Sequence, residues 1–215
     1  MTARTIGRAL RRLLRDRAAA AAVEMALATP FLLALGMVGA EVVNLAILHL
    51  RLNQLAIVVA DNASRAKQSV VGGAPQFREY DVNQVFTAAS FSVRDLTFAS
   101  RGRIILSSLE MNSSGGQWIH WQRCWGSTLY TSRYGVQGTG VTGTLFAGMG
   151  QTTVPMTVDS GNAIMFVEVA YSYTPVFFKG LIKSKVIRKE AALYVRDDRD
   201  LTKIYPTTGI TAATC

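Results

Sequence analysis

The sequence predicts an α+β protein: a long N-terminal helix, first transmembrane and then a stalk, packed on a small antiparallel β-sheet domain. An apolar pattern with helical spacing fills the first third of the chain, and runs rich in β-branched and aromatic residues follow it. Turn-like segments between several runs favour antiparallel hairpins over crossover helices. The 215 residues suffice for one domain plus an anchor, and we divide them into 1–19, 20–70 and 71–215.

Residues 1–17 form a basic tip that indicates the topology of the chain. They carry six arginines and one acid, so five of the nine net positive charges lie there. Arginines directly before an apolar run stay in the cytoplasm by the positive-inside rule. We therefore interpret 1–19 as the cytoplasmic leader of a single-pass protein of a bacterial inner membrane, and 71–215 as a periplasmic β-rich domain. Nucleic-acid binding is not expected, because no basic stripe with interleaved aromatic residues follows the tip.

The apolar segment after the tip is long enough to cross a bilayer once. Sixteen residues, Met25–Ala40, carry no charge, and the apolar character extends to Leu50. A helix of about 20 apolar residues spans the hydrocarbon core. A cleaved signal peptide is the alternative, because Val38-Gly39-Ala40 resembles a cleavage site. Glu24 inside the apolar core, and the helical pattern that continues past Ala40, favour a retained helix.

The helical pattern continues well beyond the length of a membrane span. From Glu41 to Ser69 the apolar positions keep helical spacing with neither Gly nor Pro. One helix from Ala20 to Ser69 would be about 75 Å long at 1.5 Å per residue. Its second half must therefore pack as a stalk on the domain. Glu41 and Asn44 are expected to face the outer headgroups or a partner helix.

The stretch that begins at Arg11 and runs through the helical region resembles the N-terminus of TadE/TadG-like pilus-assembly proteins of the tight-adherence (Flp-type) system. Those proteins join an arginine-rich tip to an Ala-Ala-Val-Glu segment, a proline and a leucine-rich run. The matching residues here are Glu24, Ala26, Leu27 and Pro30. Ala19 and Met25 stand where the family has a glycine and an aromatic residue. The resemblance implies a pilin-like fold.

The resemblance also implies processing and a role for Glu24. A prepilin peptidase would cut between Ala19 and Ala20, and Glu24 would become the fifth residue of the mature chain. The new N-terminal ammonium could then pair with Glu24 of a neighbouring subunit, because in low dielectric each charge offsets the desolvation cost of the other. We expect Glu24 to set the register of packed helices. The simpler alternative is a carboxylate that reaches to the headgroups.

The outer domain is predicted to contain one short helix and four strands. The helix is expected at Asp81–Arg94, and the strands at Gly102–Met111, Gln117–Trp125, Asn162–Thr174 and Lys185–Arg196. Asn112–Gly116 predicts a hairpin loop between the first two strands. Trp121 and Trp125 should share one face of their strand and Trp118 the other. The glycine-rich stretch from 126 to 161 predicts a long loop, either packed or disordered.

Residues with catalytic or metal-binding chemistry are sparse. Gly138–Gly143 matches GxGxxG, but the strand before it and the helix after it that a dinucleotide site requires are not evident. His49 and His120 lack the spaced partners of a metal site, and GxSxG is absent. We therefore expect no enzymatic activity, no cofactor and no metal.

The two cysteines, Cys124 and Cys215, favour a single disulfide. Neither belongs to a CxxC pair, which argues against zinc and thioredoxin-type chemistry, and an even count suits an oxidising compartment. The bond would close a loop of about 90 residues and contribute on the order of 4 kcal/mol. Two unrelated thiols are the alternative.

These patterns together predict a non-enzymatic, membrane-anchored minor pilin or pilus-assembly protein of the tight-adherence (Flp-type) system. Its expected partners are the membrane, other pilins or pilus-assembly platform proteins, and a prepilin peptidase. The alternative is a generic single-pass periplasmic binding or sensor protein. A long helix half embedded in a small sheet would favour the first function, and a defined cavity in the domain the second.

Overall fold

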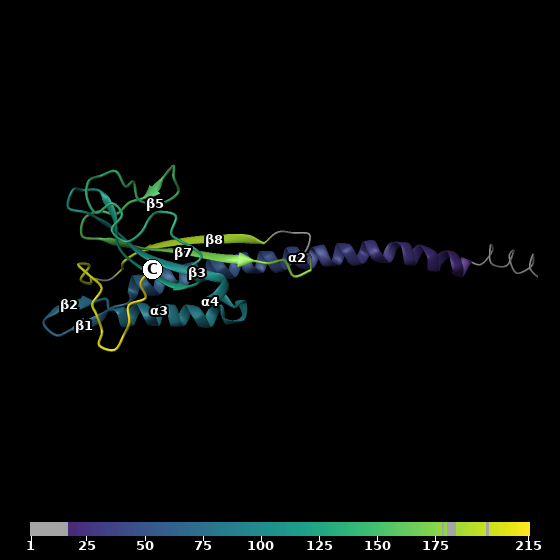
Figure 1. Ribbon diagram of the computed structural model, residues 1–215, viewed down its shortest axis with the longest axis horizontal. Helices are drawn as coiled ribbons and strands as arrows, with labels where there is room; N and C mark the ends of the chain where they lie inside the picture. The colour runs from purple at the N-terminus through teal and green to yellow at the C-terminus, as the bar shows by residue number, and fades with distance from the viewer. Residues whose placement is uncertain (1–16, 178, 180–183, 197) are drawn as a thin grey trace, which may run out of the picture.

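The computed structural model describes residues 17–177, 179, 184–196 and 198–215 (Figure 1). Its dominant feature is one helix, α2 (Arg17–Arg65), which is about 74 Å long at 1.5 Å per residue. The second half of α2 lies within a small domain, and the first half projects from it as a rod (Figure 1). The fold is α+β, with a long apolar helix and a small antiparallel sheet, as predicted. Most of the expected leader, residues 1–16, lies outside the described part of the chain.

The domain is built on a four-stranded antiparallel sheet in the order β4-β3-β7-β8. The strands are β3 (Gly102–Met111), β4 (Gln117–Gly126), β7 (Ala163–Tyr173) and β8 (Lys185–Tyr194). All four predicted strands are confirmed to within two residues, and Asn112–Gly116 is the predicted hairpin loop. The sheet therefore has the antiparallel topology that the turn-like segments predicted.

The second half of α2 forms the core of the domain. Its buried positions recur every three or four residues, so one stripe of the helix faces β7, β8 and a second helix. The stripe consists of Leu48, Leu52, Leu55, Ala56, Val59, Ala60 and Ala63. Buried side chains of the sheet, among them Ile104, Leu106 and Val167, complete the same cluster. The stalk is thus part of the domain rather than a tether to it.

The helix ends at Arg65, four residues before the predicted end at Ser69. The guanidinium of Arg199 donates hydrogen bonds to the carbonyls of Ala63 (2.8 Å) and Ala66 (2.7 Å). The carbonyl of Ala63 belongs to the last turn of α2, which has no intrahelical donors left, and Ala66 is the first residue after that turn. The following residues pair instead as a short hairpin of β1 (Gln68–Val70) and β2 (Gly73–Gln76).

The second helix, α3 (Glu79–Ser92), packs beside α2 and begins two residues before the predicted Asp81. Asp81 occupies its first turn and accepts a hydrogen bond from the backbone N–H of Arg78 at 2.9 Å. A 3₁₀ turn (Arg94–Leu96) and α4 (Phe98–Arg101) then lead into the sheet. Helices thus cover one face of the sheet (Figure 1).

The glycine-rich loop from 127 to 162 covers the opposite face of the sheet. Tyr134, Phe146, Met149 and Val158 pack on a second cluster that contains Leu109, Ile119, Ile164 and Phe166. The loop contains one small ladder, formed by β5 (Met149–Gly150) and β6 (Pro155–Met156). At Gly140, φ is 78° and a Cβ atom would lie 2.4 Å from the carbonyl oxygen of Gln117, so glycine is required. The segment is a loop, as predicted, and it is packed.

The predicted arrangement of the tryptophans is wrong for Trp118. The register of β3 with β4 shifts between Ser108 and Leu109, so His120 is an extra residue in β4. Ser108 lies opposite Trp121, and Glu110 lies opposite Trp118. Directly paired residues share a face, and the bulge therefore brings Trp118 to the same face as Trp121.

Candidate functional site

The first candidate surface is the uncovered half of α2. Every residue from Ala20 to Ala40 is exposed, and these 21 residues span about 31 Å at 1.5 Å per residue. The hydrocarbon core of a bilayer is about 30 Å thick. The exposed large hydrophobic side chains here are Val23, Met25, Leu27, Phe31, Leu32, Leu33, Leu35, Met37 and Val38. Among the described residues, α2 is the one helix long and apolar enough to cross a membrane.

Polar groups within this uncovered segment are few. The hydroxyl of Thr29 donates to the carbonyl of Met25 at 2.6 Å, so it is satisfied within the helix itself. Pro30 lies inside the helix, and α2 continues through it. The remaining polar side chain is the carboxylate of Glu24. The segment is thus compatible with an apolar environment at every position except Glu24.

Glu24 lies near the N-terminal end of the uncovered segment, about 6 Å along the helix from Ala20. Its side chain is exposed and has no partner among the described residues. The expected processing site is also on this helix, since both Ala19 and Ala20 belong to α2. Ala19, Ala20 and Glu24 thus lie at the same end of the rod. Cleavage between Ala19 and Ala20, and pairing of Glu24 with a neighbouring subunit, remain predictions.

The junction between rod and domain is made by Glu41. Although it directly follows the uncovered segment, its side chain is buried (7% exposed). The carboxylate accepts hydrogen bonds from the backbone N–H groups of Val176 (3.0 Å) and Phe177 (2.9 Å), and one from the hydroxyl of Tyr173. Charge-assisted bonds of this kind are about twice as strong as neutral ones. The expectation that Glu41 faces headgroups or a partner helix is wrong: it binds the connection that follows β7.

Asn44, one helical turn further on, lies beside the same junction. Its side-chain amide donates a long hydrogen bond (3.5 Å) to the hydroxyl of Tyr173. The sequence signal for this junction is the acid that ends an uncharged run of 16 residues. Its partners could not be identified from the sequence, because they lie more than 130 residues further along the chain.

The predicted disulfide between Cys124 and Cys215 is present, with Cα atoms 4.9 Å apart. It joins β4 to the C-terminal segment, which also pairs with β4 through the N–H of Cys124 and the carbonyl of Ala213 at 2.7 Å. The disulfide lies in the domain, distant from Glu24 and the processing site.

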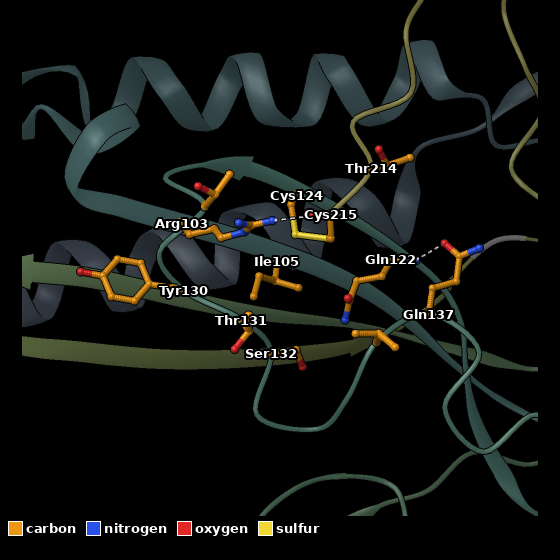
Figure 2. Close-up of a pocket in the computed structure, with 12 residues that line it drawn as sticks. Arg103, Ile105, Gln122, Cys124, Tyr130, Thr131, Ser132, Gln137, Thr214 and Cys215 are labelled. Carbon is orange, nitrogen blue, oxygen red and sulfur yellow. Dashed lines mark hydrogen bonds between the residues drawn. A yellow bond between two sulfur atoms is a disulfide. The ribbon is translucent and has the colours of Figure 1, made fainter.

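The disulfide forms one wall of a cavity of about 310 Å³ on the loop-covered side of the sheet (Figure 2). Hydroxyl and amide side chains surround much of it: Gln122, Thr128, Tyr130, Thr131, Ser132, Gln137 and Thr214. Arg103 also lines it and is buried (6% exposed). Small-molecule sites start at about this volume.

Arg103 has weak compensation for its charge. Its terminal nitrogens donate to the carbonyls of Ser127 (3.3 Å) and Cys215 (3.2 Å), and its Nε has no partner in the described structure. Burial lowers the pKa of Arg103. A buried guanidinium whose Nε has no partner favours an anion or an oxygen-rich group in the cavity.

His120 has partners that the sequence did not reveal. Its Nδ1 lies 2.8 Å from a carboxylate oxygen of Glu110, and the other oxygen accepts a hydrogen bond from the hydroxyl of Ser108 at 2.5 Å. The ring of Trp118 stacks on His120 with centroids 4.3 Å apart. The carboxylate lies between hydroxyl and imidazole, whereas a nucleophilic triad needs the imidazole in the middle. The cluster therefore lacks the order that activates a serine.

The GxGxxG run, Gly138–Gly143, is a turn within the packed loop. The amide of Asn112 holds it by donating to the carbonyls of Gly140 (2.7 Å) and Gly143 (2.8 Å). No helix follows it in the described loop, whereas a dinucleotide site needs a helix that opens directly after the glycines. Within the described ranges, no cluster of three or more His, Cys, Asp or Glu residues is placed to hold a metal ion.

Comparisons with known proteins do not assign this chain to a class, so its class must be inferred from the structure. No family model, no curated protein and no solved structure matches the chain.

Proposed function

We propose that this chain is a non-enzymatic, membrane-anchored minor pilin or pilus-assembly protein of the tight-adherence (Flp-type) system. It would cross a bacterial inner membrane once, with residues 1–19 in the cytoplasm and the domain in the periplasm. The observation that carries the proposal is that α2 is at once the apolar rod and the core of the domain. The resemblance around Glu24 and Pro30 supports the same conclusion.

Because α2 continues from the rod into the core, the position of the rod fixes the position of the domain. A protein that only needs an anchor can join it to the domain through a flexible linker, whereas α2 passes from the span into the core without a break. Glu41 fastens the transition through hydrogen bonds to the connection after β7. Packing of the rod against neighbouring helices would therefore place the whole domain, which is what a subunit of an assembly requires.

Glu24 is the residue that we propose to direct this packing. A lone carboxylate costs about 2.5–3.5 kcal/mol at the centre of a span on insertion scales and less toward its ends, where Glu24 lies, and a cationic partner offsets part of that cost. Cleavage between Ala19 and Ala20 would supply such a partner as the N-terminal ammonium of a neighbouring subunit. The pair would form in one register of two helices and would be lost in others.

The first test is the mature N-terminus of the protein isolated from its native membrane, measured by mass spectrometry. A chain that starts at Ala20 supports processing by a prepilin peptidase. A chain that starts at Met1 removes the ammonium and with it the pairing role of Glu24. A start at Glu41 would mean that the rod is a removed signal peptide, and the proposal would fail.

The second test separates assembly from anchoring. Glu24→Gln should still insert but should reduce the amount of the protein that co-purifies with pili or cross-links to its own copies in the membrane. Thr29→Val is the matched control, because it also changes a polar group of the rod but leaves Glu24 in place. Equal assembly of the two variants would contradict the role of Glu24.

A periplasmic binding module is the second candidate, and the cavity beside Arg103 is the observation that favours it. Small monocarboxylates such as acetate, glycolate and benzoate are suitable probes, since Arg103 favours an anion. A saturable rise in melting temperature that Arg103→Met abolishes would support this function. The absence of any shift with these probes would leave the assembly role as the better proposal.

A further inference from the structure

The domain carries an exposed apolar pair at the end from which the rod leaves it. Val176 and Phe177 follow β7 and are 52% and 47% exposed. Isolated exposed apolar residues are common on protein surfaces and need no explanation. The position of this pair relative to the rod makes it different.

Hydrogen bonds hold the pair at one level along α2. The backbone N–H groups of Val176 and Phe177 both donate to the carboxylate of Glu41, at 2.9–3.1 Å. Glu41 is the residue directly after the 21 exposed residues of the uncovered segment. Figure 1 shows the end of β7 alongside α2 where the helix leaves the domain. If the uncovered segment fills the hydrocarbon core, Val176 and Phe177 lie at its outer surface.

Exposed cations lie at the same end of the domain. Lys185 is opposite Tyr173 in the register of β7 and β8, and Tyr173 itself contacts Glu41. Lys179 follows the apolar pair in the sequence, and both lysine side chains are exposed. Apolar side chains bounded by lysines are the composition that binds the interface of a membrane with anionic lipids.

We propose that the start of the β7–β8 connection is a second membrane contact. Val176 and Phe177 insert into the outer interface of the bilayer that α2 spans, and Lys179 and Lys185 bind the headgroups of anionic lipids. This inference rests on the membrane-spanning part of the proposed function. Two attachments, the rod and the connection, hold the domain at a fixed tilt and rotation on the membrane, which a single helix could not do.

The test places a fluorescent probe at defined depths in the full chain. Phe177→Cys and Val176→Cys are labelled with an environment-sensitive thiol-reactive dye while the native disulfide stays oxidised. The protein is then reconstituted into vesicles of phosphatidylcholine and phosphatidylglycerol. Leu33→Cys, within the uncovered segment, is the reference for a membrane position. Val71→Cys is the reference for water, since it is exposed and lies beyond the far end of α2.

Quenching by nitroxide-labelled lipids should be strong at positions 33, 176 and 177 and weak at 71, and quenching by aqueous iodide should show the reverse order. A second set of variants, Lys179→Glu and Lys185→Glu, should weaken lipid quenching at 176 in anionic vesicles and leave it unchanged in pure phosphatidylcholine. Replacing the lysines keeps Phe177 in place, so the two sets test different parts of the contact.

Three outcomes would overturn the inference. If 176 and 177 resemble 71 while 33 is quenched by lipid, the rod spans but the connection stays in water. If 176 and 177 are shielded from both quenchers, protein rather than lipid covers them. If 33 is itself open to iodide, the rod does not span, and both this contact and the proposed anchoring fail.

Discussion

Glu41, on the helix, accepts a hydrogen bond from the hydroxyl of Tyr173, the last residue of β7, across a separation of 132 residues. The same carboxylate binds the backbone N–H groups of Val176 and Phe177, so one side chain closes the end of the domain nearest the rod. Glu41, which the sequence suggested as a headgroup contact, is therefore the residue that fastens the rod to the domain.

Removal of the carboxylate charge should loosen this end of the domain and leave the rest folded. In Glu41→Ala, the N–H groups of Val176 and Phe177 lose their acceptor, so their amide hydrogen exchange should become faster than in the unchanged protein. Exchange in the centre of β7 should not change. Asn44→Ala is the control, because its bond to Tyr173 is long and weak. Unchanged exchange at 176 and 177 in Glu41→Ala would mean that the carboxylate does not hold the connection.

Removing one partner of the buried ion pair between Arg123 on β4 and Glu79 on α3 should destabilise the domain. Arg123 donates from Nε (3.0 Å) and from a terminal nitrogen (2.5 Å) to the carboxylate, and both side chains are about nine-tenths buried. Arg123→Met leaves an uncompensated buried carboxylate and should lower the free energy of unfolding by about 3 kcal/mol.

Tryptophan fluorescence of the full chain in mild detergent, followed through urea unfolding, measures that loss. The matched control is Arg51→Met, which removes an exposed bridge to Asp95 and should cost less than about 1 kcal/mol. Similar losses in the two variants would count against the buried pair. Adding Glu79→Leu to Arg123→Met should recover part of the loss, since it removes the stranded charge.

Loss of the disulfide should destabilise the domain substantially. The bond joins residues 91 positions apart, and the chain-entropy estimate for such a loop is roughly 4–5 kcal/mol. Cys124→Ala with Cys215→Ala should therefore lower the melting temperature as much as a reducing agent lowers that of the unchanged protein. The reducing agent should have no further effect on the double variant. A double variant as stable as the oxidised protein would show that the bond adds little.

Stability should depend on pH through Glu168, a buried carboxyl group (3% exposed) on the loop side of β7. Burial raises its pKa, although the backbone N–H of Arg133 donates to it at 2.9 Å and Arg188 is nearby. Glu190, directly opposite on β8, raises the pKa further. A raised folded pKa means that the protonated form stabilises the fold below the unfolded pKa, and that this contribution is lost as pH rises through the folded pKa.

Glu168→Gln should therefore be more stable than the unchanged protein at neutral pH and about equally stable in acid, where Glu168 is protonated. Urea unfolding at several pH values measures the difference. Glu190→Gln is a useful comparison, because it also removes the repulsion while its amide oxygen can still accept the 2.8 Å bond from the hydroxyl of Tyr134. A constant difference between Glu168→Gln and the unchanged protein across the pH range would contradict the raised pKa.

The strands and the rod were predictable because their signals are local. The run Gly102–Met111 is rich in β-branched and apolar residues, and the strand has those bounds. The apolar run before Glu41 likewise indicates a span without reference to anything distant. The predicted end of α2 at Ser69 was too late, which shows the limit of local signals. No local breaker stops the helix at Arg65, and Arg199, far along the chain, caps it there.

The candidate site was only partly visible in the sequence. Glu24 stands out because a charge within an apolar run is rare, and the cysteines stand out because the sequence contains only these two. The face of Trp118 could not be predicted, because the one-residue bulge at His120 depends on how β3 and β4 pair. The pair of His120 and Glu110 and the buried Arg103 depend on the same pairing and on the loop above it.

The sequence alone determined that the chain has an apolar helix, a small antiparallel sheet and a disulfide, since each depends on composition, periodicity or counting along a short stretch. The tertiary structure decided where the rod ends and the domain begins, which acid is buried, and which exposed residues flank the point where the rod leaves the domain. The physical reason is that a hydrogen bond such as that of Tyr173 to Glu41 forms between groups distant in the chain. Its existence depends on the packing of the whole sheet against the helix.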